Sequence, residues 1–292
     1  MKKIFVTLLA VSLLTLCACS SKDTVKVSQP DTVLISGKDN FTKQELFETM
    51  RGQDYSSILI GHLSEQLALK EGASLEEMQA SADEEIEFYK SVYGDYFAQL
   101  VQSYGGEENF KANIVRGIAG DELLKRYVEK DFDTYVSDYV PVYAQMAYFD
   151  DLATANAVLE AVKNGADFAE EAANNGYTLS ADPQVYTDKD ETMNLTVKQF
   201  LNSVEGTGLS EVIPAVATTT DSTTGESTET ARYYIVNVLD TDPNNFRDEF
   251  IASVTSSLDS TEVLSYYFDK YDVTFYDQTS YDLLSATYTG LN

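Results

Sequence analysis

The chain has 292 residues, of which 43% are hydrophobic, so it is long enough for two domains of ordinary size or for one domain interrupted by another. Its formal net charge of -28 excludes nucleic acid and anionic lipid surfaces as favoured partners, because the electrostatic attraction that supports such binding has the wrong sign. The sequence contains one histidine and no acidic run with calcium-loop spacing, so we expect neither a metal ion nor another cofactor.

The N-terminus carries two lysines followed by a short apolar run. Lys2 and Lys3 precede residues 4–16, and this run is shorter than the roughly 20 residues that a membrane-spanning helix needs. The pattern predicts a cleaved export signal over residues 1–18. Its end, Leu-Cys-Ala-Cys, resembles the lipobox of bacterial lipoproteins, with a small residue directly before Cys19. We therefore predict Cys19 as the lipid attachment site.

Cys17 is a poorer lipid attachment site than Cys19, because a leucine precedes it where a small residue is expected. The alternative is ordinary cleavage with two incidental cysteines. Since the chain has no other cysteine, cleavage before Cys19 leaves no partner for a disulfide. The signal contains two lysines and no acid, so its loss changes the formal charge from -28 to -30. Residues 19–30 are polar and end in proline, which suits a tether between lipid and folded body.

Residues 31–139 are predicted to be mainly helical. A short strand is expected at 32–36, and a capping box formed by Thr42 and Glu45 begins a helix over about 41–50. Further helices are predicted at about 55–69, at 75–104 and at 108–139. The third of these carries apolar residues at spacings of three and four along its whole length, up to two consecutive glycines.

Residues 140–241 are predicted to form a smaller mixed module. It contains strands at 142–149 and 231–239, a helix at 152–163, and a short helical unit between Gly165 and Gly176. The Ser/Thr-rich run 218–230 contains no large apolar residue and is predicted to be a loop.

The remaining residues, 242–292, are predicted to return to the first domain. Helices are expected at about 244–258 and 262–270, followed by a strand at 273–276. The predicted fold class is therefore α+β, with a discontinuous, mainly helical domain formed by 31–139 and 242–292 and a module inserted at 140–241.

Several short segments carry a resemblance to a known family. The succession of small and apolar residues from Ala155 to Ala172, through the segment Gly-Ala-Asp-Phe-Ala, resembles the first helix and following turn of parvulin-type peptidyl-prolyl isomerases. Together with the lipobox and the segments 41–46 and 105–111, the chain resembles a PrsA-type foldase lipoprotein. The resemblance implies a foldase and chaperone, lipid-anchored on the extracytoplasmic face of a bacterial membrane, whose partners are unfolded or partly folded exported proteins.

The residues that would carry isomerase chemistry depart from the family pattern. Met146 and Tyr234 stand where the family has its two histidines, and the Gly-Gly-Asp-Leu-Gly motif between them is missing. Phe200 ends a segment only loosely similar to the family's Met-Val-Pro-Glu-Phe and is a possible pocket residue. The sole histidine, His62, lies among apolar neighbours in a predicted N-terminal helix, where a packing or surface role is expected.

These departures predict a degenerate module that is weakly active or inactive as a prolyl isomerase. Isomerisation needs an apolar pocket for the proline ring, exclusion of water and hydrogen bonds to the twisted amide; methionine offers no such donor, and tyrosine offers only a hydroxyl. A non-catalytic chaperone needs only an apolar or aromatic concavity. The alternative is a surface lipoprotein, an adhesin or ligand-binding module without a folding role, favoured by the lost histidines and the run 218–230. A tolerated hairpin loop is the simpler explanation of that run.

Hydrolase chemistry is disfavoured. The sequence has no nucleophile-elbow serine, and the mature chain would contain no cysteine–histidine pair.

Overall fold

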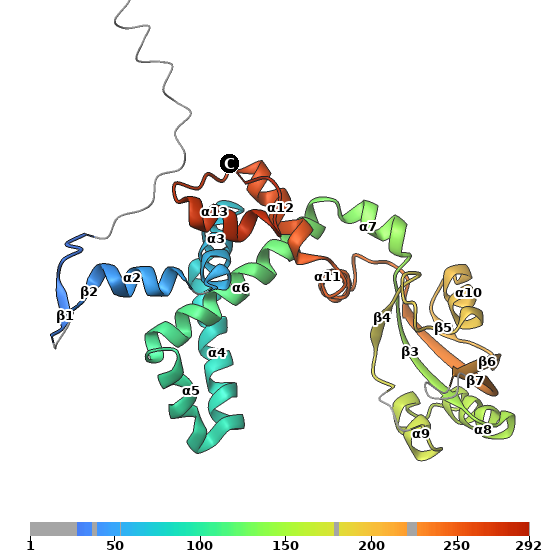
Figure 1. Cartoon of the computed structure of the whole chain (residues 1–292). Helices are drawn as coiled ribbons and strands as arrows, with labels where there is room; N and C mark the ends of the chain where they lie inside the picture. The colour runs from blue at the N-terminus through green and yellow to red at the C-terminus, as the bar shows by residue number, and fades with distance from the viewer. Residues whose placement is uncertain (1–27, 37–39, 53, 178–180, 221–226, 292) are drawn as a thin grey trace, which may run out of the picture. The chain divides into compact units, whose positions relative to one another are not determined.

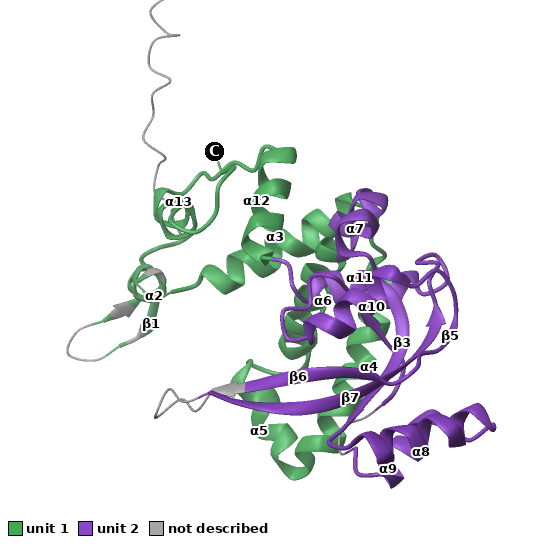
Figure 2. Cartoon of the chain, turned by 90° about the vertical axis from the view of Figure 1, so that its right-hand side faces the viewer, with its two compact units in different colours: residues 1–124, 259–292 green, residues 125–258 purple. Residues whose placement is uncertain are grey.

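The computed structural model describes residues 28–36, 40–52, 54–177, 181–220 and 227–291 (Figure 1). The predicted signal 1–18, Cys19 and most of the tether 19–30 lie outside the described residues. The chain divides into two compact units (Figure 2): unit 1 comprises residues up to 124 together with 259–292, and unit 2 comprises 125–258. Among the described residues, no helix has both the length and the apolar character needed to cross a membrane.

Unit 1 begins with a short antiparallel pair of strands, β1 (Val33–Ile35) and β2 (Phe41–Thr42). The predicted capping box is present: the Thr42 side chain accepts from the Glu45 backbone N–H, and the Glu45 carboxylate accepts from the Thr42 backbone N–H at 2.6 Å. Helices α2 (Lys43–Arg51) and α3 (Ser56–Lys70) follow, close to their predicted ranges.

The predicted long helix 75–104 is wrong as a single element. Helix α4 (Leu75–Tyr93) ends at Gly94, whose φ of 51° is favourable for glycine and breaks the α-helical ladder. A 3₁₀ turn, η1 (Gly94–Tyr96), and a second helix, α5 (Phe97–Ser103), complete the segment. Periodicity alone missed the break because the apolar spacing continues through it.

The predicted helix 108–139 is likewise two helices, α6 (Glu107–Lys130) and α7 (Phe132–Tyr139). Asp131 separates them with a non-helical backbone conformation. The split also divides the chain between units, because the end of α6 and all of α7 belong to unit 2.

The C-terminal segment completes unit 1 with α12 (Ser260–Lys270) and α13 (Gln278–Ser285). Its buried Tyr267 hydroxyl donates to the backbone carbonyl of Leu123 in α6 at 3.2 Å, and Lys270 forms an ion pair with Glu71. The predicted strand 273–276 is wrong: the segment pairs with no described strand and leads into α13, which Asp277 caps.

Unit 2 is built on an antiparallel sheet in the order β4 (Gln184–Tyr186), β3 (Val142–Phe149), β7 (Ser227–Asp240) and β5 (Gly208–Leu209). β6 (Ile213–Thr220) also pairs with β7, beyond β5. Between β5 and β6, Ser210 bridges the gap, because its N–H donates to the Val236 carbonyl at 2.8 Å and its hydroxyl accepts from the Val236 N–H at 3.0 Å.

Helices cover both faces of this sheet. On one face, β3 and β7 side chains pack against α8 (Leu152–Lys163) and α9 (Phe168–Asn174), with Phe168 fully inside this core. On the other face, Ala144, Val236 and Val238 pack against Val197 and Leu201 of α10 (Leu195–Ser203). The helical unit predicted between Gly165 and Gly176 is therefore confirmed as a corner that packs on the sheet. The predicted α+β class is also confirmed.

The predicted loop 218–230 is wrong in its described part. Residues 213–220 and 227–240 form an antiparallel hairpin in which Thr218 pairs with Glu229 and Thr220 with Ser227. Threonine favours strands because its β-branched side chain fits a pleated surface, although its hydroxyl is polar. Unit 2 is also wider than the module 140–241. α7 and α11 (Arg247–Thr255) join it through an edge-to-face contact of Phe132 and Phe250, whose ring centroids lie 5.7 Å apart.

Candidate functional site

The three candidate residues taken from the family resemblance lie in one cluster of unit 2. Met146 on β3, Tyr234 on β7 and Phe200 on α10 all pack against the apolar cluster on the α10 face of the sheet, and each keeps part of its side chain exposed. Register explains this arrangement. Met146 lies opposite Val236 and Tyr148 lies opposite Tyr234, and residues opposite each other in an antiparallel pair share a face.

A group of tyrosines surrounds the position of Tyr234. The rings of Tyr148 and Tyr234 have centroids 5.5 Å apart, and Tyr148 contacts Tyr177 edge to face, also at 5.5 Å. We call Tyr148, Tyr177 and Tyr234 the tyrosine cluster. Burial, followed by the neighbouring tyrosines, raises the pKa of Tyr177 to about 12, and burial also raises the pKa of Tyr234. At neutral pH these hydroxyls are therefore protonated and act as hydrogen-bond donors or acceptors, not as bases.

One positive charge borders the tyrosine cluster. The Arg232 guanidinium carbon lies 4.6 Å from the centroid of the Tyr148 ring, within the range of a cation–π contact, and the same guanidinium forms an ion pair with Asp150. A cavity of about 370 Å³ opens here, lined among others by Tyr148, Tyr177 and Arg232. Aromatic rings therefore line this cavity, and its bordering cation, Arg232, is already paired with Asp150.

The chemical repertoire of this cluster is narrow. The tyrosine cluster supplies hydroxyls and aromatic rings, Met146 adds a thioether, and His62 lies exposed on α3 in unit 1. Within the described part of the chain, no group of three or more His, Cys, Asp and Glu is arranged to hold a metal ion. The arrangement suits packing against an apolar ring, and it provides hydroxyl hydrogen bonds without an imidazole.

Sequence reasoning missed Tyr148, Tyr177 and Arg232 as members of this region. Tyr148 could have been predicted from the sequence, because it lies two residues after Met146 in a predicted strand and must therefore share its face. Tyr177 could not have been predicted, because it follows α9 and only the tertiary structure brings it into contact with Tyr148.

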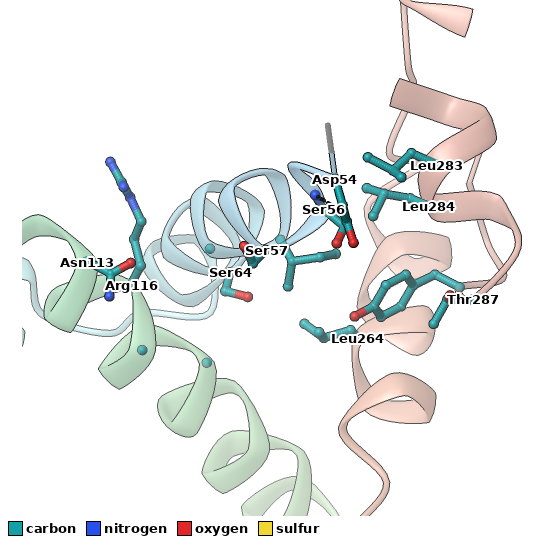
Figure 3. Close-up of a pocket in the computed structure, with 15 residues that line it drawn as sticks. Asp54, Ser56, Ser57, Ser64, Asn113, Arg116, Leu264, Leu283, Leu284 and Thr287 are labelled. Carbon is teal, nitrogen blue, oxygen red and sulfur yellow. Dashed lines mark hydrogen bonds between the residues drawn. The ribbon is translucent and has the colours of Figure 1, made fainter. Parts of the chain in front are cut away.

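Unit 1 contains a separate cavity of about 600 Å³ between α3, α6, α12 and α13 (Figure 3). Ser64 of α3 is buried and lines this cavity, and Asn113 lines it from α6. Gly117 and Gly120 of α6 also line it, and a Cβ added at either glycine would meet no atom within 4 Å. Apart from leucines and hydroxyl groups, the lining includes Asp54 and Arg116, and this combination of residues points to no particular reaction.

Comparisons with known proteins find that the chain is similar to foldase proteins named PrsA. No model of a known protein family matches it. It is 27% identical over 175 residues to foldase protein PrsA 1 of Listeria innocua, covering 58% of this chain and 55% of that protein. It is 32% identical over 136 residues to foldase protein PrsA 2 of Bacillus cereus, covering 44% of each. The chain thus matches about half the length of these curated relatives.

A solved structure of foldase protein PrsA from Streptococcus pneumoniae aligns with 88% of this chain and 100% of its own, at 18% identity and a TM-score of 0.48. The structure of the Lactococcus lactis protein aligns with 90% of this chain at 17% identity and a TM-score of 0.44. The sequence matches show a similarity to these foldases, while the degeneracy of the module stays a prediction. By those matches, the chain is distantly similar in sequence to PrsA foldases over about half of its length.

Proposed function

We propose that this protein is a lipid-anchored, extracytoplasmic foldase that acts mainly as a chaperone for exported proteins, and that its parvulin-like module is weakly active or inactive as a prolyl isomerase. Two observations together support the proposal: the sequence similarity to foldases and the side chains present at the candidate site. The chain is related to foldases, yet Met146 and Tyr234 lie on a sheet face with aromatic and apolar neighbours and without an imidazole.

The reduced activity follows from what the isomerisation barrier requires. Twisting an X–Pro bond meets a barrier of roughly 18–20 kcal/mol, and an enzyme lowers it by binding the twisted amide better than the planar one. The tyrosine cluster and Phe200 offer an apolar surface for a proline ring. An apolar surface by itself distinguishes little between the planar and twisted forms, so it supports holding a segment more than accelerating its rotation.

A protease-coupled assay on a proline-containing peptide tests the catalytic half of the proposal. We expect a rate close to the uncatalysed one, with an active parvulin as the positive control. The double variant M146H/Y234H tests whether the missing imidazoles account for the low rate. Turnover by the unmodified protein at the level of the active parvulin would overturn this half.

Suppression of aggregation tests the chaperone half without any isomerase chemistry. A denatured exported enzyme is diluted into buffer with and without the protein, and light scattering and recovered activity are followed. We expect less scattering at stoichiometric amounts of the protein. A complementary test measures the yield of a secreted reporter in cells lacking the protein; an unchanged yield together with unchanged scattering would contradict a foldase role.

Anchoring rests on the sequence alone and has its own test. Metabolic labelling with a radioactive or clickable palmitate should label the protein in a bacterium that processes lipoproteins. Cys19→Ser should abolish the label, whereas Cys17→Ser should retain it. Label that persists in Cys19→Ser would refute the assigned attachment site.

The competing proposal is a surface lipoprotein, an adhesin or ligand-binding module, with no folding role. The long β6–β7 pair favours it, because Thr218 and residues 227–230, the described residues toward its outer end whose burial is given, are exposed and mostly threonine and serine. Cell-surface binding that depends on this hairpin, with no effect on aggregation or secretion, would favour this alternative over the foldase.

A further inference from the structure

Helix α4 of unit 1 has two unlike faces. Met78, Ala82 and Ile86 are buried and attach the helix to unit 1. Phe88 and Val92 lie one turn apart on the outer side and are 61% and 59% exposed. These two residues therefore contribute little to the core of unit 1.

Further rings of α4, together with rings that follow it in the chain, extend this apolar surface. Tyr89 lies within 6.1 Å of Phe88 and 6.0 Å of Tyr93, measured between ring centroids, and it contacts the buried Phe110 of α6. Phe110 in turn contacts Tyr104 at 5.1 Å. We call the exposed members of this group the aromatic patch: Phe88, Val92, Tyr93 and Tyr104.

The surroundings of the aromatic patch are strongly acidic. Residues 83–108 contain seven Asp and Glu and a single basic residue, Lys90. The Lys90 ammonium already pairs with Glu87 at 2.7 Å, whereas Glu84 and Asp95 are exposed. Apolar surface rimmed by one sign of charge is the pattern of a surface that binds the opposite sign.

We propose that the aromatic patch and its acidic rim form a docking surface for a basic amphipathic segment of a partner protein. The apolar side chains of that segment cover Phe88 and Val92, and its lysines or arginines face Glu84, Asp95 and their neighbours. A second copy of this chain fits poorly, because its net charge of -28 would repel the rim, and an anionic lipid surface fits poorly for the same reason. The surface belongs to unit 1, whereas the parvulin-like module whose isomerase activity is tested above belongs to unit 2, so the two proposals succeed or fail separately.

The test is fluorescence anisotropy with three labelled peptides of about 18 residues, five helical turns each. One combines leucine with lysine, one leucine with glutamate, and one serine with lysine. The protein should bind the leucine–lysine peptide at least about tenfold more tightly than either of the others, and added salt should weaken this binding. Equal binding of the serine–lysine peptide, or equal binding of the leucine–glutamate peptide, would overturn the proposal.

Variants locate the binding on the surface. Phe88→Gln with Val92→Gln should weaken binding of the leucine–lysine peptide about tenfold, while Met50→Gln with Ile58→Gln, equally exposed residues of unit 1, should leave it unchanged. Thermal melts of both double variants should match that of the parent, because none of the four residues is buried. Glu84→Lys with Asp95→Lys should shift preference toward the leucine–glutamate peptide, and Glu191→Lys with Glu205→Lys in unit 2 should not.

Two other occupants of the aromatic patch, a second copy of this chain and neutral lipid, would give different experimental results. Sedimentation at working concentration that shows self-association, lost in the Phe88 and Val92 double variant, would make the patch an interface between copies and refute the proposal. Binding to vesicles of neutral phospholipid that is lost in the same variant would assign the patch to lipid and refute it equally.

Discussion

Tyr148 and Tyr234 lie opposite each other on the adjacent antiparallel strands β3 and β7, with their ring centroids 5.5 Å apart and their planes inclined by 49°. Tyr234 stands where the family resemblance expects a histidine. Its neighbours there are aromatic and apolar, so its ring is held by packing, and burial raises the pKa of its hydroxyl.

The first prediction concerns the packing of Tyr234. Tyr234→Ala should lower the free energy of unfolding by about 1–3 kcal/mol, because it removes the contact with Tyr148 and part of the apolar cluster. Tyr234→Phe should change it by less than about 0.5 kcal/mol, because the ring is retained. Urea denaturation measures both. A larger loss in the phenylalanine variant would show that the hydroxyl, not the ring, stabilises this face.

The second prediction concerns alkaline pH. Burial raises the pKa of Tyr177 in the folded protein to about 12 from an ordinary value of 10.0. Between these values the unfolded chain has lost the proton and the folded protein has kept it, so stability falls as pH rises from 10 to about 12 and is unaffected by this group below pH 10.

Tyr177→Phe should therefore flatten the decline of the urea midpoint over this range, with Tyr276→Phe, a highly exposed tyrosine, as the matched control. Equal slopes for the parent and Tyr177→Phe would contradict a buried, protonated Tyr177.

Local rules account for much of the fold. The helix from Leu152, the strand from Val142 and the capping box at Thr42 were all predictable from spacing and capping residues. The two helices predicted as single elements failed for a common cause: sequence periodicity does not reveal a backbone break that leaves the spacing intact, as at Gly94 and Asp131. Short strands such as β4 and β5 carry too few residues to show alternation, and only their pairing with β3 and β7 defines them.

The candidate site was predictable to a lesser degree. The resemblance indicated Met146, Tyr234 and Phe200, and the fold brings all three to one apolar cluster. Tyr177 and Arg232 could not be predicted, because only the tertiary structure brings them to the site. Arg232 stacks on Tyr148 from a different strand. Tyr177 follows α9, which covers the other face of the sheet.

The third prediction separates the two proposed functions through the β6–β7 hairpin. Replacing residues 218–229 with Asn-Gly would join Ala217 to Thr230, which are paired across the hairpin, by a two-residue turn. The removed side chains within the described part are exposed where their burial is given, so the free energy of unfolding should change by less than about 0.5 kcal/mol.

Suppression of aggregation should also survive this replacement if the protein is a chaperone that does not use the hairpin. A variant that folds normally but loses a surface-binding activity would instead support the ligand-binding alternative. Loss of the sheet itself, seen as a broad far-UV transition, would contradict the expected tolerance.

The fourth prediction compares two glycines of unit 1 that differ in surroundings. Gly120 lies inside α6, and a Cβ there would meet no atom within 4 Å, so Gly120→Ala should raise the free energy of unfolding by about 0.5–1 kcal/mol through helix propensity. Gly290 has a φ of 72°, and a Cβ there would lie 2.8 Å from the backbone N of Asp269 and from the backbone O of Ser265 in α12.

Gly290→Ala should therefore destabilise the protein by about 1–3 kcal/mol, because neither contacting atom belongs to a flexible side chain and the left-handed backbone itself is strained for alanine. The C-terminal residues can escape the clash only by leaving α12, which breaks the hydrogen bond from the Thr289 N–H to the Ser265 hydroxyl and the contact between Tyr288 and Phe268. Urea denaturation of the two variants side by side should give opposite shifts of the midpoint. If Gly290→Ala left the midpoint unchanged or raised it, the docking of the C-terminal residues on α12 would be wrong.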